Sequence, residues 1–241
     1  MSDHKKTLEI EQKIDVSMDD LERMFDLFKS RAINDITVKS HPRDYHDTQE
    51  LDLRGRRVSM RIERNLDGSH VQTIKQSLPS TGNNKVVNEW EDAVKSTQPD
   101  FKAIADKEAK ASLKDIKFSK LQHLYTTNVP APKFQIDVKT PEGKKGRVEL
   151  SFDVGEIYLS SQYQIKFNCF ARIPVCEIEI EYISGDQEAI DFVAAEIMAE
   201  CPSARVGTSG KGSRGARLYS DARNRYEAKK TMARAKAKLK K

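Results

Sequence analysis

The sequence lacks the features that mark membrane-spanning and secreted proteins. Its 241 residues contain no apolar run long enough to cross a bilayer, and the first residues are polar. Its three cysteines, Cys169, Cys176 and Cys201, are an odd number and form no CxxC pair. Paired or closely spaced cysteines mark disulfide frameworks and zinc sites, so this spacing favours reduced thiols. We therefore expect a cytoplasmic protein without a membrane segment.

The net positive charge is confined to the C-terminal end. The net charge is +5, but residues 221–241 contain nine Lys or Arg and two Asp or Glu, which leaves −2 for the first 220 residues. Nucleic-acid binding by the main domain is therefore not expected. We divide the chain into a domain of residues 1–219 and a basic tail of residues 220–241 that is helical or disordered. A docking arm for polyphosphate, nucleic acid or a partner protein is the alternative role of this tail. No pattern predicts an oligomeric state.

Segments with strand and helix periodicity alternate along the chain. Residues 7–14 alternate apolar and charged side chains, as a strand with one buried face does. Residues 17–30 have the apolar spacing of a helix, with Ser17 as a suitable N-cap. Further strands are predicted near 42–47, 57–64, 70–76 and 85–94 and within 133–182, with a turn at 154–156. Helical spacing recurs at 99–121 and 185–201, and 209–219 predicts a turn followed by a short strand.

Charged side chains occupy every second position in several predicted strands. They are Glu9, Glu11 and Lys13; Glu89 and Glu91; Arg147, Glu149 and Asp153; Glu177, Glu179 and Glu181; and the single cations Arg61 and Lys75. For any one strand, the simplest interpretation is a charged face in contact with solvent. Neighbouring like charges repel by a few tenths of a kcal/mol or more, however, so a row of three glutamates suggests a bound cation.

Closure of these strands into a barrel would bring the charged faces together. The apolar faces would then pack outward against helices, and the charged faces would line the interior. Carboxylates in such an interior suit hard divalent metals, whereas Lys and Arg suit a polyanion. We therefore expect an α+β fold, a closed antiparallel β-barrel with helices outside and a metal–polyphosphate site within. This hypothesis requires Glu9 and Glu179 to face the same enclosed channel.

The charged strands also resemble, in order, the motifs of the CYTH domain family, the triphosphate tunnel metalloenzymes. Residues 9–13 fit the ExExK signature that opens these domains. The later matching segments are YHDTQELDL (45–53), VSMRIE (58–63), VQTIKQ (71–76), NEWE (88–91), VELSFDVGEI (148–157), PVCEIEIEYISGD (174–186) and SGKGSRGARLY (209–219). ExExK alone is a weak pattern, but the ordered series over residues 7–219 is specific. The resemblance is to the bacterial inorganic-triphosphatase branch, without its CHAD domain, and it implies a tunnel of eight antiparallel strands.

Three positions depart from the family pattern. Glu63 replaces the second arginine of LRxR, and Val87 or Asn88 replaces the first arginine of RxExE. Gly210 splits the Ser-Lys pair of the last motif and leaves Lys211. These departures change the set of cations that would contact phosphate.

The resemblance implies roles for the motif residues. The metal ligands would be Glu9, Glu11, Glu177 and Glu179, with Glu181 and Asp153 as further ligands or as residues that hold metal-bound water. The substrate contacts would be Lys13, Arg61, Lys75, Arg147, Lys211 and Arg214. Glu89, Glu91 and Glu149 would bind a second metal or orient the cations. Catalysis would depend on Glu9, Glu11, Lys13 and Glu179, with Mg²⁺ or Mn²⁺ as the cofactor.

The implied reaction is metal-dependent hydrolysis of a triphosphate, preferably inorganic triphosphate, to phosphate and pyrophosphate. A metal would bridge the substrate oxygens, and a second metal or a carboxylate acting through water would deprotonate the attacking water. A class IV-type adenylate cyclase, a thiamine triphosphatase and a polyphosphate- or nucleotide-binding module without turnover stay open as alternatives. Outside these roles, Trp90 is expected to pack on the outer barrel face, and Asp47 to orient a cation.

Overall fold

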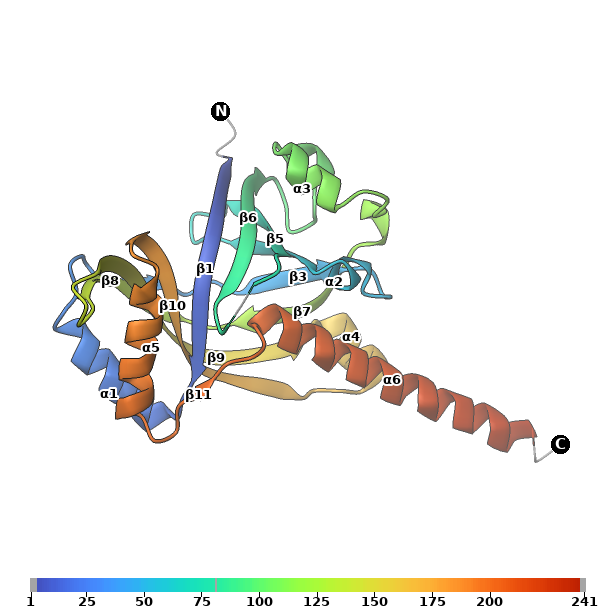
Figure 1. The fold of residues 1–241 in the computed structure, drawn as a ribbon. Coiled ribbons are helices and arrows are strands. Elements are labelled where there is room, and N and C mark those ends of the chain that lie inside the picture. Colours follow the sequence, from blue (N-terminus) through green and yellow to red (C-terminus); the bar gives the residue numbers. More distant parts are fainter. Residues whose placement is uncertain (1–3, 81, 239–241) are drawn as a thin grey trace.

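A single antiparallel sheet that closes on itself forms the body of the protein (Figure 1). The computed structural model describes residues 4–80 and 82–238. Their strands are β1 (Lys5–Asp15), β2 (Thr37–Lys39), β3 (Arg43–Asp47), β4 (Val58–Arg64), β5 (His70–Ser77), β6 (Lys85–Val94), β7 (Gln122–Asn128), β8 (Ala131–Lys139), β9 (Lys145–Leu159), β10 (Arg172–Gly185) and β11 (Arg205–Val206). Eight of them run around the barrel in the order β10-β1-β6-β5-β4-β3-β7-β9, and β9 pairs with β10 to close it. The predicted closed eight-stranded barrel is therefore confirmed.

The helices lie on the outside of the barrel or extend away from it (Figure 1). They are α1 (Met18–Lys29), α2 (Asp52–Gly55), α3 (Lys107–Ser112), α4 (Ser161–Phe167), α5 (Glu188–Glu200) and α6 (Lys211–Lys238), with 3-10 turns at Phe101–Ala103 and Phe118–Lys120. The predicted N-cap of α1 is confirmed, because the Ser17 hydroxyl accepts a hydrogen bond from the Asp20 amide at 3.2 Å. Within the described residues, none of these helices combines the length and apolar character needed to cross a bilayer.

Three clusters of buried apolar side chains attach the helices to the outer barrel wall. α1 and α5 share one cluster with β8, β9 and β10, where Phe152 and Ile178 are almost fully buried. α4 and the first turns of α6 share a second cluster around Tyr163 and Tyr219. α3 covers the third, in which Trp90 is fully buried on the outer face, as predicted. Because the apolar side chains pack outward, the barrel interior is left to the polar ones.

The predicted turn at residues 154–156 is wrong, because β9 continues through it to Leu159. A Cβ atom on Gly155 would lie 2.2 Å from the carbonyl oxygen of Asn128, the last residue of β7. This glycine therefore allows a close approach of two backbones within the sheet.

The helical prediction for residues 99–121 is only partly correct, because one short helix and two 3-10 turns occupy this range. The apolar side chains of the segment, including Ile104 and Leu113, cover Trp90 at one end of the barrel. Apolar spacing identified the buried side chains here but not the breaks between the turns.

The turn and strand predicted for residues 209–219 are wrong, because helix α6 begins at Lys211. Gly212 and Gly215 suggested a turn, since glycine is a poor helix former. A Cβ atom on Gly215 would lie 2.2 Å from the ring of Tyr125, so this glycine lets α6 pack closely against β7. α6 also continues across the predicted domain boundary at residues 219 and 220, and its last buried residue is Ala222.

Candidate functional site

The inner faces of the strands line one cavity of about 620 Å³ that contains most of the predicted site residues. Its nine cationic side chains are Lys13, Arg43, Arg54, Arg57, Arg61, Lys75, Lys85, Lys133 and Lys211. Its eight acidic side chains are Glu9, Glu11, Asp47, Glu89, Glu149, Asp153, Glu179 and Glu181. Glu9 and Glu179 thus share the channel, as the barrel hypothesis requires. Because the two signs nearly balance, a bound polyanion would leave excess negative charge unless a cation enters with it.

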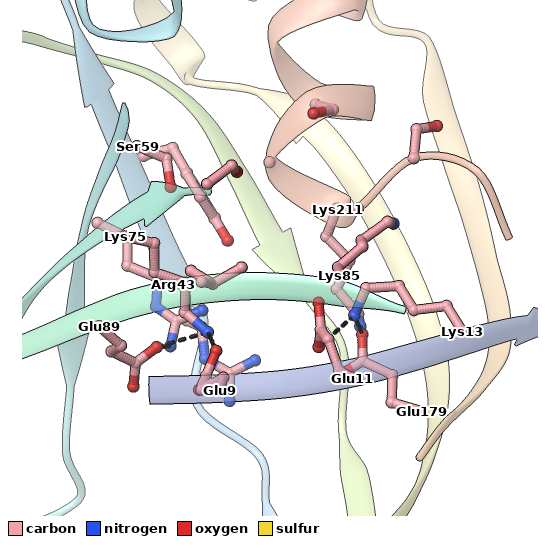
Figure 2. A pocket seen from close by; sticks show the side chains of 18 of the residues that line it. Glu9, Glu11, Lys13, Arg43, Ser59, Lys75, Lys85, Glu89, Glu179 and Lys211 are labelled. Carbon is pink, nitrogen blue, oxygen red and sulfur yellow. Dashed lines mark hydrogen bonds and ion pairs between the residues drawn. The ribbon is translucent and has the colours of Figure 1, made fainter. Parts of the chain in front are cut away.

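Lys13 lies in a group of charges on the right of Figure 2. Its ammonium is 2.8 Å from Glu11 and also contacts Glu179. Burial disfavours the charged form of Lys13, but the charges of Glu11 and Glu179 outweigh this effect and raise its pKa. Burial likewise opposes ionisation of Glu179, but Lys13 and Lys211 hold its pKa well below the usual range. Lys13 and Glu179 are therefore both charged at neutral pH.

Lys75 joins two glutamates in a second group, on the left of Figure 2. Its ammonium lies 2.5 Å from Glu9 and 2.5 Å from Glu89. The Arg61 guanidinium lies 3.9 Å from the same Glu89 oxygen that Lys75 contacts. Burial opposes ionisation of Glu89, but Lys75 and Arg61 lower its pKa to about 2. The cations predicted to bind phosphate are thus held in place by carboxylates of neighbouring strands.

Among the described residues, a third group, formed by Asp153, Glu177 and Glu179, has the geometry to hold a metal ion. One oxygen of each carboxylate lies within 4.8 Å of the others. The Lys211 ammonium lies among them, 2.7 Å from Glu177, 2.5 Å from Glu179 and in contact with Asp153. The Lys211 ammonium therefore occupies a position surrounded by three carboxylates. Carboxylate oxygens are also the ligands that Mg²⁺ and Mn²⁺ prefer.

Glu181 is a tunnel glutamate whose pKa lies near neutral pH. It lines the cavity, and burial raises its pKa to about 7, with added effects from the charges of Glu9 and Glu149. Lys75 contacts Glu9 and Lys133 contacts Glu149, and the charges of these two lysines oppose the rise without cancelling it. Glu181 can therefore release and accept a proton near neutral pH.

Two residues predicted to bind substrate are not in the cavity lining. Arg147 forms an ion pair with Asp137, its cross-strand neighbour on β8, at 2.8 Å, and both side chains are largely exposed. Arg214 on α6 contacts Glu177, whose side chain is almost inaccessible. Arg147 is thus directed away from the site, and Arg214 neutralises a buried carboxylate.

The cavity also contains cations that the motifs did not indicate. Arg43 lines it and lies 2.8 Å from Glu63, the residue that departs from the LRxR pattern. Lys85 lies on the inner face of β6, two residues before Val87, and directly opposite Glu11 on β1. The period-two rule could have identified Lys85, because it shares the face of Glu89.

Two aromatic rings form part of the wall and connect it to α6. The rings of Tyr45 and Tyr125 are stacked, with their centroids 4.9 Å apart. The Tyr125 hydroxyl donates a hydrogen bond to the Gly212 carbonyl at 2.7 Å. Asp47, which was expected to orient a cation, accepts hydrogen bonds from three backbone amides around the start of α2 at 2.7, 2.9 and 3.1 Å. Its role is therefore to fix the backbone of this corner.

The sequence matches a known protein family. The model of the CYTH domain family matches residues 7–215, which include nearly the whole barrel and the first turn of α6. The chain therefore belongs to the CYTH domain family, as the ordered motifs predicted.

Two solved structures have a similar fold, and both are of proteins named "putative" adenylate or adenylyl cyclases. The one from Bacillus halodurans is 20% identical, with a TM-score of 0.54 over 87% of this chain and 97% of that chain. The one from Hippeastrum is 12% identical, with a TM-score of 0.51 over 86% of this chain and 95% of that chain. The Hippeastrum protein is described as having a dominant triphosphatase activity. At these low sequence identities, the similarity shows that the proteins share a fold.

Proposed function

We propose that this protein hydrolyses a triphosphate, preferably inorganic triphosphate, inside the barrel with Mg²⁺ or Mn²⁺. The observation that carries the proposal is a three-carboxylate cluster at the tunnel wall beside the Lys and Arg side chains that line the cavity. Asp153 and Glu179 of the cluster belong to this lining, and the buried Glu177 lies behind it. A phosphoryl transfer needs neutralised charge and a fixed substrate more than covalent help from the protein. Both requirements match this lining.

The cluster of Asp153, Glu177 and Glu179 fits a divalent cation, because a cationic group already lies against all three carboxylates. Glu9, Glu11 and Glu181 of the same lining are the further candidate ligands. A bound Mg²⁺ or Mn²⁺ would neutralise phosphate oxygens and lower the pKa of coordinated water.

The chain's own cations would bind and orient the substrate. Lys13, Lys75 and Arg61 can exchange carboxylate partners for phosphate oxygens, because their ammonium and guanidinium groups face the cavity. Lys211 would make the same exchange when a divalent cation takes its place among the carboxylates. Glu181 is suited to accept the proton of the attacking water, since its pKa of about 7 matches neutral pH.

Hydrolysis is favoured over cyclisation of ATP by the chemistry of the lining. Of the residues that line the cavity in the described part of the chain, none is Asn, Gln, Phe or Trp. Edge-on hydrogen bonds from amides and stacking on free aromatic rings are the usual ways to hold a base. The aromatic rings of the lining already have ring partners, because Tyr45 stacks on Tyr125 and His46 packs against His123. The dominant triphosphatase activity ascribed to the Hippeastrum protein agrees with this preference.

A screen of phosphate release tests the proposal. Inorganic triphosphate, ATP, GTP and thiamine triphosphate are each incubated with Mg²⁺ and with Mn²⁺, and cyclic AMP is measured in the ATP samples. Phosphate release from triphosphate is the expected result. Cyclic AMP as the main product of ATP would support the cyclase, and tight triphosphate binding without phosphate release would support a binding module.

Glu179→Gln tests the site residues. We expect a loss of at least about 100-fold in turnover, since the variant removes a carboxylate that contacts both Lys13 and Lys211. Circular dichroism and a metal titration accompany the assay. Glu196→Gln is the matched control, because Glu196 pairs with Arg31 at 2.7 Å outside the tunnel. Unchanged turnover of Glu179→Gln at every metal concentration would remove the assignment.

A further inference from the structure

The last part of α6 carries exposed cations that pair with no described carboxylate. Residues 225–238 contain six Lys or Arg and one Glu, and every described residue after Tyr226 is exposed where the helix projects from the barrel (Figure 1). None of the six cations forms an ion pair within the described residues, whereas Arg223, just before them, pairs with Glu50 at 2.6 Å. Tertiary packing normally supplies most of the stability of a helix, so this segment lacks its usual support. A binding partner would supply it.

These six cations form two rows on opposite sides of the helix. At 3.6 residues per turn, the two rows lie roughly 160° apart around the helix axis and extend over about 20 Å of its length. The single acidic residue, Glu227, lies within the second row, and alanine is the commonest residue between the rows, so the helix is narrow there. The rows are Arg225, Lys229 and Lys236 on one side, and Lys230, Arg234 and Lys238 on the other.

Cations on two opposite sides exclude the simplest partners of a basic helix. Helices that lie on membrane surfaces have their cations on one face and large apolar side chains on the other. Here the cations occupy both sides, and Met232 is the single large aliphatic side chain among residues 227–238. Contact with α6 of a second copy would bring like charges together, which is unfavourable. The arrangement therefore fits a partner that places negative charge on both sides of the helix.

The major groove of B-form DNA places negative charge in this way. The groove is about 12 Å wide and admits an α-helix, whose diameter with side chains is about 10–12 Å. A phosphate chain borders the groove on each side, so each row of cations would face one strand. The major groove of A-form RNA is too deep and narrow for such an approach. Because alanine offers no hydrogen bond to base edges, the contacts would be to phosphates and independent of sequence.

We propose that residues 225–238 of α6 form a docking helix that binds duplex DNA in the major groove without sequence preference. The two rows of cations would replace counterions along both phosphate chains, and release of these counterions would drive the association. Since α6 begins at the tunnel with Lys211 and continues unbroken to Lys238, the docking helix would hold the barrel beside the DNA. The proposal goes beyond the proposed function and does not depend on turnover in the tunnel.

Fluorescence anisotropy over a series of salt concentrations tests the docking helix, with a labelled DNA duplex of mixed sequence about 20 base pairs long. Six phosphate contacts predict a slope of about −5 in a plot of the logarithm of the binding constant against that of the salt concentration. Truncation after Tyr226 should weaken binding at low salt by at least about 30-fold. Each row is tested by a double variant, Lys229→Gln/Lys236→Gln or Lys230→Gln/Arg234→Gln. Either variant should make the slope less steep by about 2.

A matched control and three other polyanions complete the test. Lys117→Gln/Lys120→Gln removes the same charge from exposed positions outside α6 and should leave the slope unchanged. Duplex RNA of the same sequence, vesicles that contain anionic lipid, and polyglutamate should each bind at least about fivefold more weakly than the DNA. Urea unfolding of the truncated protein, which is expected to match the wild type, excludes misfolding as the cause of weaker binding.

Each part of the proposal has an outcome that would overturn it. DNA affinity that survives truncation, or an equal change of slope in the control variant, would overturn the assignment to α6. Equal affinity for duplex RNA would overturn the groove geometry, and binding of vesicles or polyglutamate as tight as that of DNA would overturn the choice of DNA. Because no turnover is measured, these outcomes are independent of whether the protein hydrolyses triphosphate.

Discussion

The inner and outer faces of β10 contribute to the free energy of folding through different interactions. On the outer face, Ile178 and Ile180 have no exposed surface and pack in the cluster formed with α1 and α5. On the inner face, Glu177, Glu179 and Glu181 bring like charges together in a buried tunnel. Burial of apolar area stabilises the fold, whereas burial of charge opposes it unless a partner compensates. Stability and ligand binding can therefore be altered separately on one strand.

Ile178→Ala should produce the largest change in stability among the variants of this comparison. Loss of a fully buried isoleucine side chain costs about 2–5 kcal/mol of unfolding free energy. Triphosphate affinity of the folded protein should stay within about twofold, since Ile178 faces away from the cavity. Urea unfolding and calorimetry measure the two quantities. The inner-face control is Ser151→Ala, which removes one hydrogen bond to Asp153 and should cost less than about 1.5 kcal/mol. A larger loss for Ser151→Ala than for Ile178→Ala would refute the contrast.

Glu181→Gln, in contrast to Ile178→Ala, should increase the free energy of unfolding of the metal-free protein at high pH. The pKa of Glu181 rises from 4.5 to about 7 on folding, so between these values the folded state retains a proton that the unfolded state has lost. Stability from this group therefore falls as pH rises through this window, by about 1.4 kcal/mol for each pKa unit, and the loss is complete above pH 7. Unfolding in EDTA at pH 8 should show a gain of about 1–3 kcal/mol for Glu181→Gln, with no gain at pH 4. Equal gains at both pH values would contradict the assigned shift.

Truncation after Tyr226 should produce the smallest effect. α6 begins inside the tunnel at Lys211, its next turns pack in the outer cluster around Tyr219, and its last part extends away from the barrel (Figure 1). None of the described residues after Tyr226 is buried. The change in unfolding free energy should therefore stay within about 0.5 kcal/mol. A loss above about 1 kcal/mol in urea unfolding would show that the end of α6 contributes to the fold.

The strands could be predicted well because their period is visible in the sequence. The segments predicted near residues 57–64 and 85–94 correspond closely to β4 and β6, and their alternation identified the inward face of Arg61 and Glu89. Glycine-containing segments were predicted less well. At Gly155 and Gly215 the glycine serves a close contact with a distant segment, Asn128 or Tyr125, and local sequence contains no information about such a neighbour.

The sequence alone determined the alternation of charged and apolar side chains, and with it a barrel whose charges point inward. Only the tertiary structure decided which charges meet. Arg147 shares the parity of Glu149 but pairs with Asp137 away from the cavity, whereas Lys85 is buried in the tunnel with no described partner. The physical reason is that strand period fixes the face on which a side chain lies, while its partners depend on how far each strand extends and on which strand lies beside it.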